Sequence, residues 1–423
     1  MGKVVLTGKG RRWLESGHPW AFRDDVAEAE AEPGEIAAIL GPGGKPLGFG
    51  AYSSASRIAV RLVTRSKEEP DRAFWRALVA RAVDARARMG YLEPDGACRL
   101  IAGDSDGIPG LVVDRYADIG VFQSGTQGAD RMRDLVAELL DEVLPSRLAT
   151  LVDRSDAAVR RLEALDRKVE VLRGTLPEFA VIRELDLHYE VDVLGGHKTG
   201  HYLDQRENRI LAAARAPGRE VLDAFSYDGL FGVRAAMRGA RSVLCLDQSE
   251  AALERARRNA ERNGVAGLVQ TRRANCMSEL RALARQETQF GLVVVDPPAF
   301  ARNRREIAGA ERGYVGVNRR AMDLVESGGT LVSASCSYNV RAPAFVEFLA
   351  RAAREAGRDA FLEELAGAAP DHPALLALPE SAYLKCAFLR VEGEPRMRGR
   401  KDPERESTVA DDDDRDRAER PQA

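Results

Sequence analysis

The spacing of hydrophobic and polar positions divides the first part of the chain into two segments with different periods. Short apolar runs separated by a glycine-rich turn predict a small β-rich module over residues 1–66. From Phe74 to Val83, apolar residues recur three and four positions apart, which predicts a helix. This change of period places a domain boundary near residue 68.

The middle of the chain alternates between the two periods. Strands are predicted at 110–114 and 149–152, and helices at 131–144 and 156–165. This alternation predicts a small central α/β domain. A hairpin pattern at 179–194 then leads into the next unit.

The last unit repeats a strand, a glycine-bearing turn and a helix. Its strands are predicted at 220–223, 242–247, 291–296 and 329–333. Continuous apolar strands alternating with helices indicate a doubly wound, mostly parallel sheet, whose ligands bind beyond the carboxyl ends of the strands. The predicted domains are 1–68, 69–190 and 191–394. Residues 395–423 form a charged tail that we expect to be disordered, because it has almost nothing to bury.

Composition narrows the class of protein. With 44% hydrophobic and 30% charged residues among 423, the chain is globular, and no apolar run approaches the ~18 residues of a membrane span. The short apolar run after Lys3 is followed at once by Lys9, Arg11 and Arg12, which does not fit a secretory signal, so we expect a cytoplasmic protein. The five cysteines are scattered and form no CxxC pair, which disfavours disulfides and a zinc site; we expect no metal. The net charge of −3 hides an acidic tail, so the rest of the chain is slightly basic.

The turn after the first strand of the last unit has the composition of a nucleoside-binding loop. Residues 223–232 follow this strand and open a helix, and their glycines allow a close approach of backbone to ligand. Asp247 ends the next strand, where an acid accepts hydrogen bonds from both hydroxyls of a ribose. The Gly-x-Gly-x-x-Gly that binds a pyrophosphate is absent. This favours S-adenosylmethionine (SAM), which has no pyrophosphate, over a dinucleotide.

Two further strand ends carry an acid and a thiol. Asp296 precedes two prolines that fix the backbone, and Cys336 ends the following strand. If these strands are neighbours, their ends lie roughly 5 Å apart and face one pocket. A thiolate that adds to carbon 6 of cytosine makes carbon 5 nucleophilic, and a carboxylate beside N3 stabilises the adduct by sharing a proton. The pair therefore favours methylation of a pyrimidine.

These motifs resemble those of the RlmI-like large-subunit ribosomal RNA 5-methylcytosine methyltransferases, over nearly the whole chain. The most specific stretch is 195–209, which reads Gly-Gly-His-Lys-Thr-Gly-His-Tyr-Leu-Asp-Gln-Arg-Glu-Asn-Arg. Residues 223–229, 296–298 and 335–337 follow in the family's order. Residues 9–22 look like its PUA RNA-binding module, and 99–116 are similar to its central linking domain.

The resemblance implies a Rossmann-like class I methyltransferase domain, preceded by a β-rich PUA-like domain and a small α/β domain. It implies SAM as cofactor, ribosomal RNA as partner, Cys336 as nucleophile and Asp296 as the acid that binds the base. The implied cofactor residues are Tyr202, Gln205, Asp223, Phe225, Ser226, Gly229, Asp247, Asn275 and Asp296. The implied substrate contacts are Lys198, Pro297, Pro298 and Phe300.

The chain departs from the family pattern at two places. Asn275 stands where an acid is expected near the adenine, and the usual Gly-Tyr-Lys-Asp reads Gly-Tyr-Val-Gly at 313–316. The second departure leaves the exact RNA target open. His197 and His201 are further candidates for phosphate or substrate contacts, and we expect Trp13 and Trp20 to be core aromatics.

Two other functions stay open. A guanine-methylating RNA methyltransferase would share the fold and cofactor, but the related RlmK-like domains lack a cysteine at position 336. A non-catalytic RNA-binding assembly factor would keep the cofactor fold without turnover, and the presence of both Asp296 and Cys336 argues against it. The sequence also leaves open whether the protein forms a homodimer.

Overall fold

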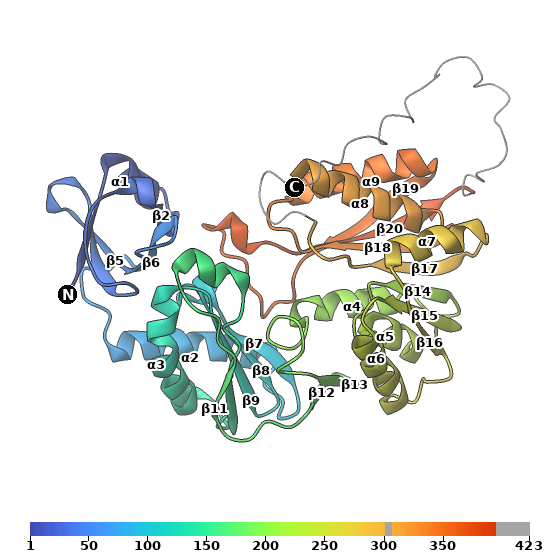
Figure 1. Ribbon diagram of the computed structural model, residues 1–423, viewed down its shortest axis with the longest axis horizontal. Helices are drawn as coiled ribbons and strands as arrows, with labels where there is room; N and C mark the ends of the chain where they lie inside the picture. The colour runs from blue at the N-terminus through green and yellow to red at the C-terminus, as the bar shows by residue number, and fades with distance from the viewer. Residues whose placement is uncertain (301–306, 395–423) are drawn as a thin grey trace, which may run out of the picture.

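The computed structural model describes residues 1–300 and 307–394 (Figure 1). Within them the strands form three larger sheets and one hairpin, arranged in chain order. The predicted disordered tail lies outside the described residues. No helix in the described part of the chain is long and apolar enough to cross a membrane.

The amino-terminal sheet has six strands in the order β2-β6-β5-β4-β1-β3. All of its pairs are antiparallel except β1 with β4. Its elements are β1 (Lys3–Leu6), α1 (Gly8–Glu15), β2 (Trp20–Phe22), β3 (Val26–Glu30), β4 (Ile36–Leu40), β5 (Pro46–Tyr52) and β6 (Ile58–Thr64), with short 3-10 turns at Arg23–Asp25 and Pro42–Gly44. The predicted β-rich module is confirmed.

The tryptophans of this module differ from the prediction. Trp13 is 41% exposed and stacks on His18, and Trp20 is half-buried, with its indole Nε1 donating to Asp104 of the next domain at 2.7 Å. The small core is filled instead by aliphatic residues such as Leu14 and Ile39. Both rings therefore lie at the surface of the module.

The central domain has a five-stranded sheet in the order β11-β10-β9-β8-β7, in which only β9 and β10 are parallel. Its elements are α2 (Arg72–Arg88), β7 (Ala97–Ala102), η3 (Gly103–Asp106), β8 (Leu111–Tyr116), β9 (Ile119–Ser124), α3 (Gln127–Val143), β10 (Thr150–Asp153), η4 (Ala158–Glu163) and β11 (Glu170–Arg173). Asp71 caps α2 by accepting from the Phe74 amide, as expected for the start of the predicted helix.

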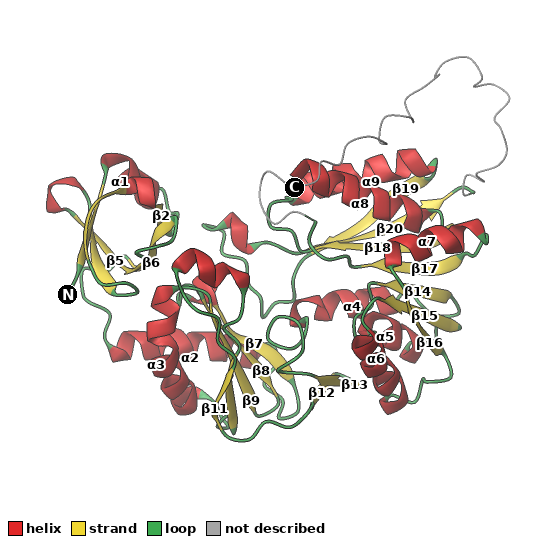
Figure 2. Ribbon diagram, viewed as in Figure 1, coloured by secondary structure: helices red, strands yellow, loops and turns green. Residues whose placement is uncertain are grey.

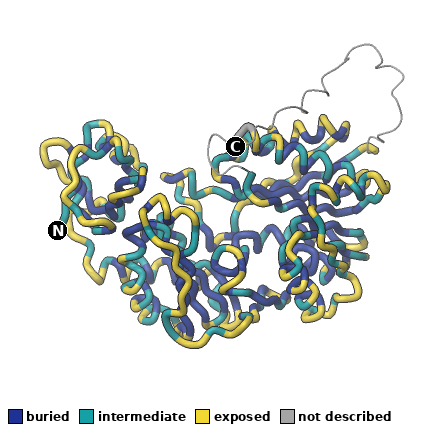
Figure 3. Tube along the Cα trace, in the orientation of Figure 1, coloured by how far each residue is buried: buried dark blue, intermediate teal, exposed yellow. Residues whose placement is uncertain are grey.

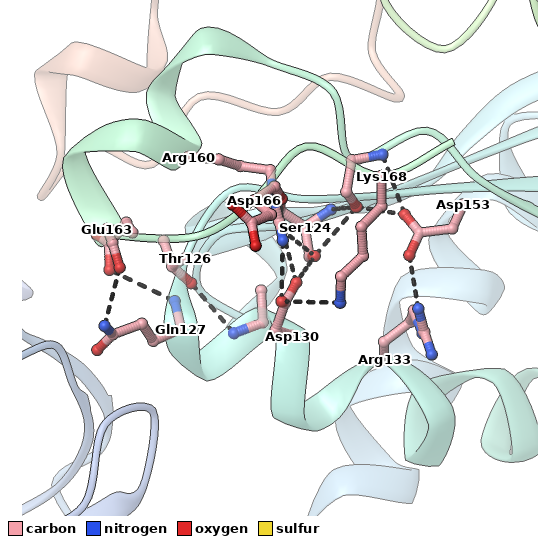
Figure 4. Close-up of polar contacts among 12 residues, drawn as sticks. Ser124, Thr126, Gln127, Asp130, Arg133, Asp153, Arg160, Glu163, Asp166 and Lys168 are labelled. Carbon is pink, nitrogen blue, oxygen red and sulfur yellow. Dashed lines mark hydrogen bonds and ion pairs between the residues drawn. The ribbon is translucent and has the colours of Figure 1, made fainter. Parts of the chain in front are cut away.

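The helix predicted at 156–165 is wrong: only the short 3-10 turn η4 forms there. The apolar residues that suggested a helix face are exposed, with Val159 at 47% and Leu162 at 67%. Arg160 and Glu163 are buried instead. Their hydrogen bonds to the sheet and to α3 fix the turn, as Figure 4 shows.

The carboxyl-terminal domain follows the predicted hairpin of β12 (Ala180–Glu184) and β13 (Leu187–Val191). Its seven-stranded sheet has the order β16-β15-β14-β17-β18-β20-β19, parallel up to β18 and antiparallel beyond it. The elements are η5 (Leu203–Gln205), α4 (Arg206–Ala213), β14 (Glu220–Ala224), α5 (Leu230–Met237), β15 (Ser242–Asp247), α6 (Glu250–Arg262), β16 (Val269–Arg273), α7 (Cys276–Arg285), β17 (Phe290–Val295), α8 (Ile307–Met322), β18 (Val325–Ser335), α9 (Ala342–Ala356), β19 (Asp359–Ala366), η7 (Pro379–Ser381) and β20 (Lys385–Glu392).

The layers of this domain place the site. Helices α4 to α6 lie on one side of the sheet and α7 to α9 on the other (Figure 2). The inner strands between them are largely buried, whereas the edge strands β16 and β19 are mostly exposed (Figure 3). Because β14 leads to β15 on one side and β17 lies on its other side, the strand order reverses between β14 and β17. A doubly wound sheet binds its ligand beyond the carboxyl ends at such a point.

The three predicted domains follow these sheets. The boundaries at 68, 190 and 394 stay predictions, because residues on the two sides of a boundary contact each other. Tyr116 of β8, for example, contacts Thr199 of the following domain at 2.9 Å.

Candidate active site

A cavity of about 360 Å³ lies beyond the carboxyl ends of β14, β15, β17 and β18. Among the residues that line it are the predicted Lys198, Tyr202, Gln205, Phe225, Ser226, Asp247, Asn275, Asp296, Pro297, Pro298, Phe300 and Cys336. The structure therefore brings together residues from seven separate segments of the sequence, at the point where the strand order reverses.

Two predicted cofactor residues lie behind the wall of this cavity. Asp223 is 1% exposed and accepts from the Gly232 amide at 2.9 Å, and burial raises the pKa of Asp223 to about 8. Gly229 begins α5 with a φ of 75°, and a Cβ there would lie 2.8 Å from Ala256 of α6. Both residues shape the loop from inside, and neither is among the residues that line the cavity.

The loop between these two residues has an unusual backbone. Phe225 and Tyr227 adopt positive φ angles of 62° and 51°, which side-chain-bearing residues rarely do outside functional sites. The Tyr227 amide donates to Asp247 Oδ2 at 3.0 Å, while the Ser249 amide donates to Oδ1 at 2.8 Å. Asp247 therefore clamps the loop against the end of β15 and presents its remaining lone pairs to the cavity.

Aromatic rings close one side of the cavity. His197 stacks on Tyr227 with 4.8 Å between ring centroids, and its Nδ1 lies 2.9 Å from the Tyr202 hydroxyl. Burial lowers the pKa of His197, which favours its neutral form. His201, the other candidate histidine, also lines the cavity, but it is only 3% exposed and its Nδ1 lies 2.9 Å from Asp228.

Lys198 is paired within the cavity. Its ammonium lies 2.7 Å from Asp204 Oδ2 and 4.4 Å from the centroid of the Tyr202 ring. The same Asp204 oxygen accepts from the Tyr383 hydroxyl at 2.6 Å. Although burial would raise the pKa of Asp204, the charges of Lys198 and His372 and the hydrogen bonds from Lys198 and Tyr383 together outweigh it and hold that pKa well below its usual range. Sequence reasoning missed Asp204; its position directly before Gln205 in the 195–209 segment was the available signal.

Asp296 is held by a neutral partner. Gln205 Nε2 donates to Asp296 Oδ2 at 2.9 Å, and the Asn208 amide fixes the orientation of Gln205 by donating to its Oε1 at 2.6 Å. Burial, and then the negative charge of Asp204, raise the pKa of Asp296 to about 6. A carboxyl group with such a pKa exchanges a proton readily near neutral pH.

Cys336 is half-buried and lines the same cavity as Asp296. Burial raises the pKa of its thiol, and the charge of Asp296 raises it further. The register of the parallel pair β17 and β18 explains the placement: Val295 lies opposite Ser333, so both chains leave the sheet at the same edge. The predicted convergence of carboxyl and thiol is therefore present in the structure.

The backbone around Cys336 is fixed from two sides. The Tyr314 hydroxyl bonds Ser335 Oγ at 2.8 Å and Ser337 Oγ at 2.9 Å, and all three residues are buried. Lys385 Nζ donates to the Ser337 carbonyl at 2.7 Å, and burial lowers the pKa of this lysine to about 8. Tyr314 belongs to the altered Gly-Tyr-Val-Gly segment, so the tyrosine of that motif has a clear structural role.

The remaining predicted residues form the rim. Asn275 caps α7 by accepting from the Ser278 amide at 3.1 Å, which leaves its amide nitrogen free to donate into the cavity. Pro297 is buried and Pro298 exposed. Phe300 packs its edge against Tyr314 with 4.9 Å between centroids. Among the described residues, no cluster of three His, Cys, Asp or Glu could hold a metal ion.

Comparison with known proteins gives consistent matches. A family model of S-adenosylmethionine-dependent methyltransferases matches residues 152–390, and one of PUA-like domains matches residues 4–65. The ribosomal RNA large subunit methyltransferase I of Shewanella amazonensis is 40% identical over 394 residues, 92% of this chain and 99% of that protein. The protein of the same name from Aeromonas hydrophila is 39% identical over 398 residues, 92% of this chain and 100% of that protein.

The fold is also found in solved structures. A Streptococcus mutans protein described as a candidate SAM-dependent methyltransferase superposes with a TM-score of 0.79 at 20% identity, covering 92% of this chain and all 100% of that one. At this identity the likeness concerns the fold alone.

A SAM-dependent methyltransferase is the class that this fold and its cavity define, and the family model agrees. The full-length relatives take the assignment one step further. The chain belongs to the ribosomal RNA large subunit methyltransferase I family, with a PUA-like domain at its amino-terminal end.

Proposed function

We propose that the protein methylates carbon 5 of a cytosine in large-subunit ribosomal RNA, through a covalent adduct with Cys336. The observation that carries this proposal is the opening of Cys336 and Asp296 onto one cavity. The names of the relatives supply the RNA class, and the PUA-like domain offers a second RNA-binding surface. A cytoplasmic location follows from this substrate and stays a prediction.

The cavity fits SAM, which supplies the electrophilic methyl group. Asp247 would accept from the ribose hydroxyls and Asn275 would donate to the adenine. Phe225 to Gly229 would pass beneath the cofactor, and Tyr202 and Gln205 would lie near its methionine end. The observation that supports this fit is the strained loop whose backbone Asp247 holds against the cavity.

The residues of the chain would perform the rest of the reaction. As Cys336 sulfur adds to carbon 6 of the cytosine, its proton passes to the ionised Asp296 and from there to N3 of the ring. Carbon 5 would then take the methyl group of SAM, with S-adenosylhomocysteine as the leaving group. Loss of the carbon 5 proton to a solvent water would break the bond between sulfur and carbon 6, and the N3 proton would return through Asp296 to restore the thiol. The pKa of about 6 suits Asp296 to accept and return one proton near neutrality.

The target base would enter along the rim. Pro297 and Pro298 fix the backbone past Asp296, and Phe300 offers a ring edge beside them. Lys198, already held by Asp204, would contact the substrate side without leaving its partner. Enzymes that act on a base inside an RNA strand take it out of the stack in this way.

A trapping experiment tests the covalent step. RNA with 5-fluorocytosine at the target would accumulate a denaturant-stable adduct, because the fluorine at carbon 5 cannot leave as a proton does. The wild-type protein should form this adduct in the presence of SAM, and Cys336→Ala should not. Nucleoside analysis of methylated natural RNA should give 5-methylcytidine. A methylated guanosine would support the rival RNA methyltransferase, and cofactor binding without any transfer would support the assembly factor.

A further inference from the structure

A second cavity, of about 420 Å³, lies where the three domains meet. Trp20, Ile58 and Arg61 line it from the amino-terminal sheet, and η3 and β8 line it from the central domain. Its third wall is the segment 372–383, which leads from β19 back to β20 (Figure 1). Figure 1 shows this orange-red segment reaching away from its own sheet toward β2.

The wall between the two cavities is one chain thick. Tyr383 lines the second cavity, while its neighbour Leu384 lines the catalytic one. The Tyr383 hydroxyl crosses this wall to donate to Asp204 at 2.6 Å, and Asp204 holds Lys198 on the catalytic side. A group bound in the second cavity would therefore lie next to the substrate side of the active site.

The walls of the second cavity are aromatic and aliphatic. Trp20 and Tyr383 contribute rings, and Ile58, Val112 and Leu378 contribute aliphatic side chains. Base rings stack on aromatic side chains in proteins that bind single-stranded nucleic acid, which tolerate many sequences in this way. The volume lies in the range of sites for small organic ligands.

The charges of this cavity favour a neutral ring over a phosphate. Arg61 is paired with Glu163 at 2.9 Å, and Arg99 donates to both oxygens of Asp114 at 2.8 Å. Both cations are thus neutralised. The carboxylate acceptors that line the cavity are the second oxygen of Asp104, whose first accepts from Trp20, and Glu380 Oε2, which is buried without a hydrogen-bond partner and lies 3.9 Å from His18 Nε2. Carboxylates accept from the amino groups of bases.

A buried polar cluster holds the cavity in shape (Figure 4). Arg160 donates to the Ser124 carbonyl at 2.8 Å and to both oxygens of Asp130, at 2.6 and 3.0 Å. These bonds fix η4 and, with it, Val159 in the cavity wall. Glu163 of the same turn pairs with Arg61 of β6. The amino-terminal and central domains are therefore locked together before any ligand binds, which lowers the entropy cost of binding.

We propose that the second cavity binds the base of an unpaired nucleotide of the substrate RNA that lies beside the target cytosine. The proposal rests on the proposed function and deepens it. The target base enters the catalytic cavity, and its neighbour stacks between Trp20 and Tyr383 on the other side of the Tyr383–Leu384 wall. Asp104 and Glu380 read the amino groups of that second base.

A cavity-filling variant tests this proposal. Ser105 lines the cavity from η3 and is half-exposed. Ser105→Phe would fill the space, with Ser105→Ala as the matched control. A second filling variant, Val159→Phe, starts from a residue that is 47% exposed and tolerates a larger side chain. The substrate is the ribosomal RNA region around the mapped cytosine, with an abasic nucleotide placed at each flanking position in turn.

We expect one abasic position to lower kcat/KM of the wild-type protein about tenfold. Ser105→Phe and Val159→Phe should lower kcat/KM on intact RNA by a similar factor, leave SAM affinity unchanged, and show no further loss with the abasic RNA. If the effects of a filling variant and of the abasic position multiply, the inference is overturned. It is also overturned if the filling variants keep full activity. Either result would leave the proposed function intact. Competition by free nucleosides without any abasic effect would instead assign the cavity to a small molecule and likewise overturn it. If the wild-type protein methylates no RNA at all, the proposed function itself fails.

Discussion

Two buried clusters of this protein differ in how their central carboxylate is paired. In the central domain, Arg160 is fully buried and shares both its terminal nitrogens with Asp130 (Figure 4). In the catalytic cavity, Asp296 has the neutral amide of Gln205 as its hydrogen-bond partner. The first carboxylate is matched by a cation in direct contact, and the second is not.

The pKa values report this difference. Burial would raise the pKa of both carboxyl groups. At Asp130 the hydrogen bonds and charge of Arg160 outweigh burial and lower the pKa, whereas at Asp296 burial prevails and the pKa rises to about 6. A paired buried charge fixes the architecture, while an unpaired one is held ready to exchange a proton. The comparison teaches that the partner, not the burial, separates Asp130 from Asp296.

The strongest way to break this comparison is to remove the nucleophile. Cys336→Ala should lower methyl transfer by at least ~10⁴-fold, because the other thiol that lines the cavity, Cys276, is only 5% exposed and donates to the Leu246 carbonyl at 3.5 Å. SAM affinity should be unchanged, since Cys336 lies beyond the cofactor residues. Rates of tritium transfer from labelled SAM and a calorimetric titration measure the two quantities.

The matched control for this variant is Cys98→Ala, which removes a buried thiol of β7 in the central domain. Its transfer rate should equal that of the wild type. Retained activity in Cys336→Ala would remove the covalent mechanism and leave Cys336 as a small buried side chain.

The next largest effect should come from the structural cluster. Arg160→Met leaves Asp130 with the Ser124 hydroxyl and, as a cation, Lys168 at 3.5 Å, and should lower the free energy of unfolding by about 3–5 kcal/mol. Urea denaturation measures it. Arg147→Met removes a similar ion pair at the surface, where Arg147 is 67% exposed, and should cost below about 1 kcal/mol. Equal losses in the two variants would mean that burial does not strengthen the pair.

The candidate pair of Asp296 and Cys336 could be predicted from the sequence because its position depends on local patterns. The apolar runs that become β17 and β18 are easy to recognise, and Asp296 and Cys336 follow them directly. Parallel neighbours end at one edge of a sheet, so only the strand order had to be right. The same reasoning placed Asp247 correctly at the end of β15.

Contacts between distant segments could not be predicted in this way. Asp204 and Tyr383 are 179 positions apart, and the segment that joins them across the wall has no periodic pattern. A helix was predicted at 156–165, but only the 3-10 turn η4 forms there. Arg160 turns inward because it donates to Asp130 and to the Ser124 carbonyl. Buried ion pairs of this kind invert the hydrophobic pattern, and their partners are unknown until the chain has folded.

A third experiment concerns Asp247, an acid of the cavity that is held by backbone amides. Asp247 accepts from two backbone amides and keeps lone pairs for a ribose. Asp247→Ala should weaken SAM binding by about 1–3 kcal/mol, because a charged acceptor and the clamp on the 225–229 loop are both lost. Calorimetry would measure the change, with the neighbouring surface residue Glu250→Ala as control. Unchanged affinity would show that the ribose binds elsewhere.

The smallest expected effect is a pH-dependent change in stability, and it tests the comparison most directly. Replacing Asp296 and replacing Asp130 should change the free energy of unfolding with opposite sign. Because the folded-state pKa of Asp296 is raised to about 6, the native protein binds more protons than the unfolded chain between about pH 4 and 6, and its stability falls as the pH rises through that window. Asp296→Asn removes this penalty. It should be more stable than the wild type by about 1–2 kcal/mol above pH 6, with the gain vanishing below about pH 4.

Asp130→Asn should do the reverse. Its lowered pKa means that ionised Asp130 stabilises the fold above its unfolded pKa of about 4, and that this contribution is lost only as the pH falls through the lower folded-state value. The variant should therefore be less stable at pH 7 by about 2 kcal/mol, and the difference should shrink in acid. Urea titrations of both variants at several pH values compare the two slopes. If Asp296→Asn also destabilised the protein at pH 7, Asp296 would be a paired structural acid like Asp130, and its proposed role in proton transfer would lose its physical basis.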